Sequence, residues 1–280
     1  MKAPFPFFGG KRRIASAIWQ RFGDVPNLVE PFAGSLAVLL ARPDTHAWWD
    51  RTETVNDYDG LIANYWRATQ QSPAEVAHHA NWPVNENDLH ARHAWLVGRK
   101  AELQARLEGD PDYYDAKAAG WWLWGICAWI GSGWCSGDGP WQVVDGQLVH
   151  LGSSGNGINR QRVHLGSNGQ GHAEAWSEHL RVMMQRLSAR LRRVRVCCGD
   201  WSRVCGPTPT VKLGLTGVFL DPPYGEGRSD ALYRVDSLDV AGQVREWALA
   251  HGDNPLLRIA LCGYEGEHEM PGWDAWQWKA

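Results

Sequence analysis

The stretch Gly217-Val218-Phe219-Leu220-Asp221-Pro222-Pro223-Tyr224 decides the fold class of this chain. Its first four residues form an apolar run that predicts a buried strand, and Gly225 and Gly227 after it favour a loop. Polar groups are therefore displayed at the carboxyl end of a strand. In an open α/β sheet that edge is where ligands bind.

The residues of this turn are suited to hold a planar amine. Asp221 offers carboxylate oxygens as hydrogen-bond acceptors, and the carbonyl of Pro222 offers another because proline keeps its C=O. Pro222 and Pro223 fix φ at two successive positions, so Tyr224 is expected to form a flat platform against a ring. An ordinary Pro-Pro turn is the alternative interpretation.

Length and composition set outer bounds. The 280 residues suffice for one large domain or for a core domain with an insertion. The net charge of −3 does not indicate a nucleic-acid-binding protein, so any basic surface must be local. Eighteen tryptophans exceed what a core of this size needs, and some are expected to form surface platforms or to line a groove.

Cysteine, histidine and hydropathy patterns exclude other classes. The six cysteines show no CxxC spacing and predict free thiols in a reducing compartment. His78-His79 and His90-x-x-His93 lack companion cysteines at ligand spacing, so no metal site is predicted. No segment reaches the ~18 uncharged apolar residues of a membrane span, and the N-terminus lacks a signal peptide's apolar core. We expect a soluble, cytoplasmic protein.

The N-terminal arm runs from aromatic through glycine to basic residues over 4–13 and leads into a predicted helix over 14–22. Gly9-Gly10 permits close approach of the backbone to a ligand, and Lys11 is suited to meet a carboxylate. A flexible arm followed by a helix start is the alternative.

Residues 27–32 predict a strand, and 33–40 a glycine turn into a helix. This is the first βα unit of a nucleotide-type fold, but it lacks the GxGxxG fingerprint of a dinucleotide site. A second strand over 54–59 carries Asp57 where such folds bind ribose hydroxyls.

Two later strands complete the predicted sheet together with the one before Asp221. The strand over 194–201 ends at Asp200, suited to accept from an adenine amino group, and at Trp201, suited to pack near the adenine ring. The strand over 256–264 is the fifth.

The alternation of strands and helices is interrupted between the second and third strands. Residues 121–135 are rich in tryptophan and predict a buried helix, and 152–172 are rich in glycine, asparagine and glutamine, which suit base edges and phosphates. A helix follows with Trp176, Leu180, Met183, Leu187 and Leu191 on one face. Its arginines form either a nucleic-acid contact or a solvated face; they are Arg181, Arg186, Arg190, Arg192, Arg193 and Arg195.

In chain order, the five strands carry Pro31 to Gly34, Asp57, Asp200 with Trp201, Asp221 to Tyr224, and Gly263 with Tyr264. This order resembles the Dam-like (D12 class) adenine-N6 DNA methyltransferases. The resemblance implies an α/β fold, with a Rossmann-like S-adenosylmethionine-dependent methyltransferase sheet. It assigns residues 1–66 and 173–280 to the catalytic domain and 67–172 to an inserted target-recognition region.

The resemblance also implies the site residues, because the (W/F)xGGK arm, the VEPFxG segment, a strand-terminal aspartate and DPPY all match. It assigns cofactor binding to Phe7, Gly9, Gly10, Lys11, Glu30, Pro31, Phe32, Gly34, Asp57, Asp200, Trp201 and Asp221. It assigns catalysis to Asp221, Pro222, Pro223 and Tyr224. The implied partner is double-stranded DNA, with no membrane and no obligate protein partner.

The sequence departs from the family pattern at two places. Leu36 stands where the family has a second glycine, and its side chain is expected to crowd the methionine end of the cofactor. The family sheet also continues past the fifth strand. These departures keep open the alternative of a non-catalytic DNA-binding protein on the same fold. A methyltransferase for cytosine N4 or RNA is a second alternative, because related motifs modify other amines.

Overall fold

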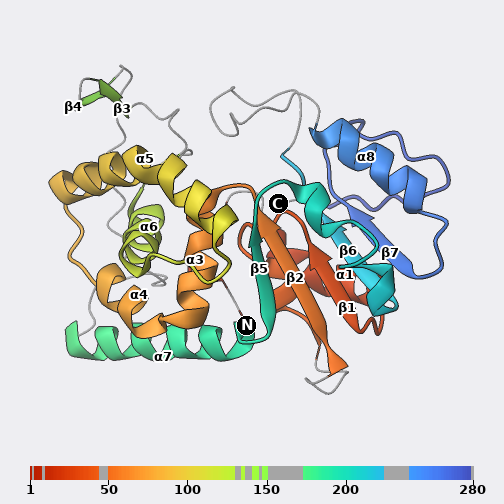
Figure 1. Cartoon of the computed structure of the whole chain (residues 1–280), viewed down its shortest axis with the longest axis horizontal. Coiled ribbons are helices and arrows are strands. Elements are labelled where there is room, and N and C mark those ends of the chain that lie inside the picture. The colour runs from red at the N-terminus through yellow and green to blue at the C-terminus, as the bar shows by residue number, and fades with distance from the viewer. Residues whose placement is uncertain are drawn as a thin grey trace.

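The protein is an α/β fold built on a five-stranded parallel sheet with the order β5-β2-β1-β6-β7 (Figure 1). The computed structural model describes residues 1, 3–7, 10–43, 50–129, 134–135, 141–144, 147–150, 173–223 and 240–278. The strands are β1 (Asn27–Glu30), β2 (Thr52–Asp57), β5 (Val194–Cys198), β6 (Thr216–Leu220) and β7 (Leu257–Leu261). All five predicted strands are confirmed, and counted along the chain their order is 3-2-1-4-5, which is Rossmann-like.

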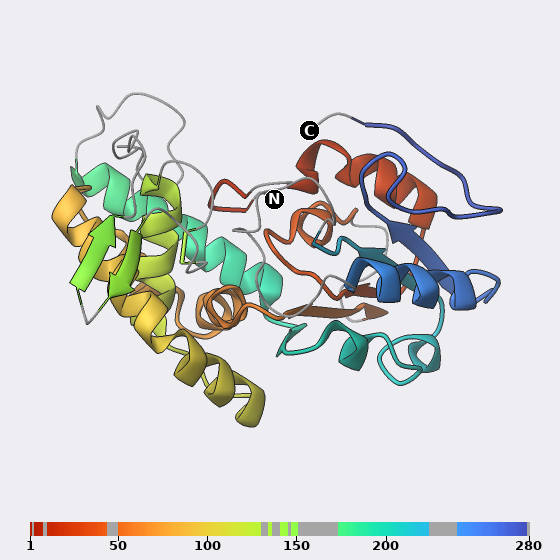
Figure 2. The ribbon, with the colours of Figure 1, turned by 90° about the horizontal axis from the view of Figure 1, so that it is seen from above.

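Helices cover both faces of this sheet, as Figure 2 shows from above. Successive side chains of a strand point to opposite faces, so Leu28 and Phe219 enter one core while Val29 and Val218 enter the other. The first face packs against α1 (Ala15–Phe22) and α2 (Ala37–Leu40), and the second against η3 (Trp201–Val204) and α8 (Val240–His251). The short helices η1 (Lys11–Arg13) and η4 (Val211–Leu213) lie in connections.

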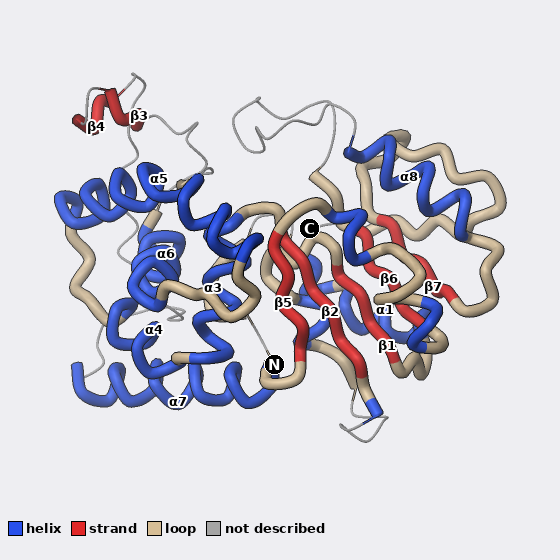
Figure 3. Tube along the Cα trace, viewed as in Figure 1, coloured by secondary structure: helices blue, strands red, loops and turns tan. Residues whose placement is uncertain are grey.

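A lobe of helices lies beside the β5 edge of the sheet (Figure 3). The Trp-rich segment forms a buried helix in this lobe, as predicted. The lobe comprises α3 (Gly60–Gln71), α4 (Pro73–Ala80), α5 (Glu86–Gly109), α6 (Ala116–Ala128) and α7 (Ala173–Leu191). A two-stranded hairpin, β3 (Trp141–Val144) with β4 (Gln147–His150), follows α6 in the chain.

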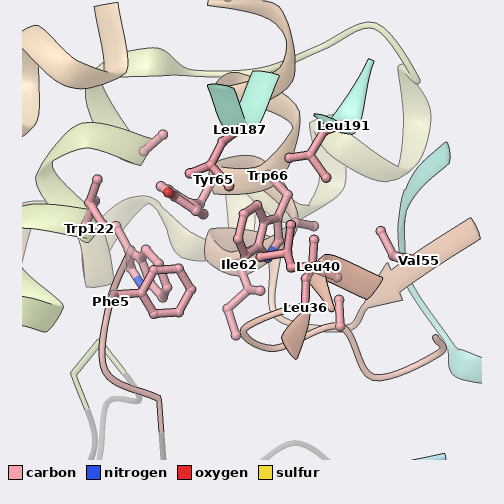
Figure 4. Close-up of a cluster of buried hydrophobic side chains, with 14 of the residues drawn as sticks. Phe5, Leu36, Leu40, Val55, Ile62, Tyr65, Trp66, Trp122, Leu187 and Leu191 are labelled. Atoms are coloured by element: carbon pink, nitrogen blue, oxygen red, sulfur yellow. The ribbon is translucent and has the colours of Figure 1, made fainter. Parts of the chain in front are cut away.

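Helix α3 joins the lobe to the sheet. Arg67 donates to the carbonyl of Val196 at 2.9 Å and Gln70 to that of Val194 at 3.0 Å, so side chains of α3 occupy the outer carbonyls of β5. An edge protected in this way is a poor template for another strand. On the opposite flank of α3, Tyr65 packs with Phe5 and Trp122 in the cluster of Figure 4.

Helix α7 differs from its prediction in register and in the use of its arginines. Met184, and not Met183, is fully buried with Leu180 and Leu187. Arg190 binds the buried carboxylate of Glu53 at 2.6 and 2.8 Å and also donates to the Leu39 carbonyl at 2.9 Å. This arginine is structural, because it compensates a charge inside the core.

All six cysteines are free, as predicted. No helix in the described part of the chain is long and apolar enough to cross a bilayer.

Candidate functional site

The sheet order reverses between β1 and β6, and the carboxyl ends of the strands meet at this edge. The chain leaves β1 toward β2 on one side, whereas β6 continues to β7 on the other. A reversal of this kind opens a crevice outside the strand ends, which is the usual ligand position in such sheets. Glu30, Asp57 and the turn at Asp221 all lie at this edge.

A buried ion pair at this edge joins Lys11 to Asp221. The Lys11 Nζ lies 2.7 Å from each carboxylate oxygen of Asp221. The lysine is 3% exposed and the aspartate side chain 22%, so the ammonium is buried behind a carboxylate that reaches the surface. The indole of Trp278 lies on the same ammonium, with 5.4 Å between Nζ and the ring centroid. Pro222 is buried and Pro223 half-buried.

The N-terminal arm reaches this position by packing across the β1–α2 turn. Phe5 anchors it against Trp122 at 5.0 Å between ring centroids. The Phe7 ring then lies over Gly34, where a Cβ would come within 2.7 Å of it and where φ is +45°. Only glycine meets both conditions without strain. The Gly10 N–H donates to the Phe7 carbonyl at 3.1 Å and directs the chain into Lys11.

Asp57 ties the β1–α2 turn to the start of α3. Its Oδ2 accepts from the Gly34 N–H and its Oδ1 from the Asp59 N–H, both at 2.9 Å. Burial raises the pKa of Asp57, while these two bonds act in the opposite sense. Each oxygen keeps a further lone pair, so the carboxylate can still accept two hydroxyl groups.

Three residues that hold this edge together escaped the sequence analysis. Asn56 is buried and donates to the carbonyls of Pro31 at 3.1 Å and Gly199 at 2.9 Å, so it links the ends of β1 and β5. The Trp66 indole donates to the Gly34 carbonyl at 2.9 Å. The Lys100 Nζ binds Asp59 at 2.9 Å and so connects α5 to the same turn. The sequence signal for Asn56 was its position in a predicted strand, directly before the aspartate at which that strand ends.

Asp200 and Trp201 follow β5 but face different surroundings. Asp200 is exposed and caps η3, since its Oδ1 accepts from the Ser202 N–H at 2.9 Å and from the Ser202 hydroxyl. Trp201 is only 7% exposed and stacks on Phe32, with 6.2 Å between ring centroids and 27° between planes. The structure therefore brings the predicted residues of β1 and β5 together, with the indole inside the second core.

Two titratable groups lie beneath the edge. Glu30 is 1% exposed, and burial raises its pKa to about 8, with the Leu39 N–H opposing this and the charges of Glu53 and Asp221 adding to it. Cys262 is also buried, and burial raises its pKa to about 12. In the described ranges, no group of three or more His, Cys, Asp or Glu side chains is placed to hold a metal ion.

Leu36 adopts the backbone conformation that a glycine would have in its place. Its φ is 52° and its ψ 32°, which is the left-handed region, and it caps the N-terminus of α2. The side chain is fully buried in the core that contains Leu40, Ile62 and Trp66 (Figure 4). The core takes up the side chain that was expected to crowd the cofactor.

Of the predicted site residues, Gly9 and Tyr224 lie outside the described residues, as does the loop over 152–172. The others gather at the carboxyl edge of the sheet. No protein-family model matches the chain, and no curated protein sequence matches it.

Proposed function

We propose that this chain is a site-specific DNA methyltransferase that transfers a methyl group from S-adenosylmethionine to the N6 amino group of adenine. The observation that carries the proposal is the ion pair between Lys11 and Asp221 at the strand-order reversal, beside the turn of Gly34 that Asp57 holds. The motif order along the chain supports the same function.

The residues at the edge fit the cofactor. Asp57 keeps lone pairs that suit the two ribose hydroxyls, and its bond to the Gly34 N–H holds the β1–α2 turn beside it. Asp200 is exposed and suited to accept from the adenine amino group. When bound, S-adenosylmethionine would supply a methyl group on a sulfonium, from which a neutral thioether is an excellent leaving group.

The turn at Asp221 would hold the target amine. The Asp221 carboxylate and the Pro222 carbonyl accept its two hydrogens, which concentrates electron density on nitrogen as the new N–C bond forms and the S–C bond breaks. The surplus proton then leaves to solvent. Lys11 fixes the orientation of the carboxylate, since its ammonium contacts both oxygens.

The target adenine must leave the duplex to reach this turn, at a cost of a few kcal/mol for unstacking. The helical lobe, which falls largely within residues 67–172, is proposed to recognise the target sequence. The backbone of Leu36 keeps the glycine-like turn, and this observation favours a catalytic protein over the non-catalytic alternative.

Incubation of the purified protein with methyl-labelled S-adenosylmethionine and mixed-sequence duplex DNA, followed by digestion to nucleosides, tests the proposal. We expect label in N6-methyldeoxyadenosine. Label in N4-methyldeoxycytidine, or transfer to RNA alone, would show the alternative enzyme. Cofactor binding without any transfer would show the non-catalytic protein.

A pair of variants attributes the activity to the turn. Asp221→Ala is expected to abolish transfer while cofactor binding, followed by calorimetry, stays within a few-fold. Asp253→Ala is the matched control, since Asp253 is an exposed aspartate after α8, and it should retain full activity. Equal activity of the two variants would show that Asp221 has no part in the transfer reaction.

A further inference from the structure

The surface where α5 meets α6 carries a continuous group of aromatic and cationic side chains, which we call the aromatic–cation strip. Its members are Trp95, Arg99 and Arg106 of α5, Tyr113 of the connecting segment, and Lys117 and Trp121 of α6. Figure 1 shows α5 along one border of the helical lobe, with α6 packed against it.

The centre of the strip is a pair of indoles with cations on them. The rings of Trp95 and Trp121 meet edge to face at 5.0 Å between centroids. The Lys117 Nζ lies 4.4 Å from the centroid of Trp121 and 5.1 Å from that of Trp95, and the Arg99 guanidinium lies 4.9 Å from Trp95. These contacts hold both cations in fixed positions but leave their N–H groups able to donate.

The strip continues along α5 without a break. The Arg106 guanidinium lies 4.5 Å from the centroid of the Tyr113 ring. Glu102 lies between the two arginines, at 3.7 Å from Arg99 and 3.9 Å from Arg106. Trp95, Arg99 and Tyr113 also line one small cavity, which shows that the members are neighbours in space.

The charges of the strip are incompletely neutralised. Lys117 is exposed and has no ion-pair partner among the described residues, and Glu102 is shared by two arginines through long, exposed contacts. At the inner end, Arg92 is 7% exposed with its guanidinium 4.2 Å from Trp124. Its Nη1 is buried without a hydrogen-bond partner in the part of the chain that the structure describes.

The arginines recur at a spacing that suits a nucleic-acid backbone. Arg99 and Arg106 are both exposed and seven residues apart, so they lie on nearly one face of α5 about 10.5 Å from each other, whereas Arg92, one interval earlier, is buried. That interval is about three times the ~3.4 Å axial rise per nucleotide of one DNA strand. Because cations already cover the indole faces, the aromatic rings are not free to stack on bases, and contact to phosphates is favoured over base readout.

We propose that the aromatic–cation strip binds the phosphate backbone of duplex DNA and sets the position of the helical lobe on it. This inference rests on the proposed function, and it adds the surface that contacts the substrate away from the catalytic turn. Contacts of this kind position the duplex without reading its sequence.

The test is binding of a short fluorescent mixed-sequence duplex, followed by anisotropy over a series of salt concentrations. Arg99→Gln, Arg106→Gln and Lys117→Gln are each expected to reduce the magnitude of the slope of log K against log salt by about 1. Affinity should fall equally for unrelated duplex sequences. Arg99→Lys keeps the charge and should keep the slope.

Lys212→Gln is the matched control, since Lys212 is an exposed lysine on η4, outside the strip. The slope of log K against log salt for this variant should equal that of the unmodified protein. If the unmodified chain binds DNA and transfers methyl groups, and the strip variants bind like Lys212→Gln, the strip is not a DNA-binding surface. The proposed function would then still stand. No binding and no transfer by the unmodified chain would overturn both. Far-ultraviolet circular dichroism shows whether each variant is folded.

Discussion

The ammonium of Lys11 contacts both carboxylate oxygens of Asp221 at 2.7 Å, although 210 residues separate the two in the chain. The pair closes the N-terminal arm onto the turn after β6. In the proposed reaction, the turn therefore carries an oriented acceptor before the target amine binds, and preorganisation of this kind is a main source of catalytic rate.

Lys11→Met is expected to slow methyl transfer about 100-fold, because removing the partner of a partly buried charge costs about 2–3 kcal/mol. Single-turnover transfer and calorimetric cofactor affinity separate two roles. A loss of rate at unchanged affinity shows that Lys11 acts through Asp221. A loss of affinity alone would show instead that it binds the cofactor.

Asp57→Ala is expected to weaken S-adenosylmethionine binding by about 10- to 100-fold, since it removes the carboxylate and the two hydrogen bonds, each worth about 1.5 kcal/mol, by which it holds the Gly34 turn and the start of α3. The rate at saturating cofactor should change less than the affinity. Calorimetry measures the first and steady-state kinetics the second. Unaltered affinity would contradict the assignment.

Trp278→Ala is expected to lower the transfer rate about 10-fold, because the indole lies on the Lys11 ammonium at 5.4 Å and covers it from solvent. Trp278→Phe keeps a ring and should recover most of the rate. Trp276→Ala is the control, since Trp276 is 45% exposed and rests on Arg21 instead. Similar losses in Trp278→Ala and Trp276→Ala would point to a general effect on the segment.

Leu36→Gly is expected to be more stable than Leu36→Ala by about 1 kcal/mol, although both lose a buried side chain at a cost of about 2–5 kcal/mol. The reason is the φ of 52°, which alanine tolerates poorly. At Leu40, inside the helix α2 that follows Leu36, the order should reverse because glycine is the weaker helix former there. Urea unfolding of the four variants gives both differences.

Glu30 should make the protein less stable as the pH rises. The pKa of Glu30 is about 8 in the folded protein, whereas an ordinary glutamate has a pKa of 4.5. Between these two pH values the folded state therefore keeps a proton that the unfolded state has lost. A raised carboxyl pKa contributes stability that is complete below about pH 4.5 and is lost progressively up to about pH 8. The loss amounts to a few kcal/mol at most.

Glu30→Gln removes this titration and should reduce the fall in unfolding free energy between pH 5 and 8, as measured by denaturant titration. The remaining fall is expected from Asp57, whose pKa burial raises to about 7. Glu75→Gln, at an exposed glutamate of α4, should keep the slope of the unmodified protein. A steep fall that persists in Glu30→Gln would assign it to another group.

Much of the fold could be predicted from local sequence patterns. Strands such as β6 and β7 were predicted because each is a short apolar run followed by polar or glycine residues, and a buried parallel strand has this composition. Strand β2 was predicted from a short segment that closes on acidic residues one βα unit after β1. The Trp-rich helix was predicted for the same reason. Met184 was missed because two adjacent methionines lie near the boundary of an apolar stripe, and only packing selects between them.

The sequence by itself determined that Asp57, Asp200 and Asp221 lie at or directly after the ends of strands, because strand composition and turn residues are local properties. Only the tertiary structure decided that Lys11 pairs with Asp221 and that Asn56 links two strand ends. Contacts between residues far apart in the chain depend on which surfaces of helices and sheet meet. A buried charge or amide takes whichever partner that packing brings within hydrogen-bond distance.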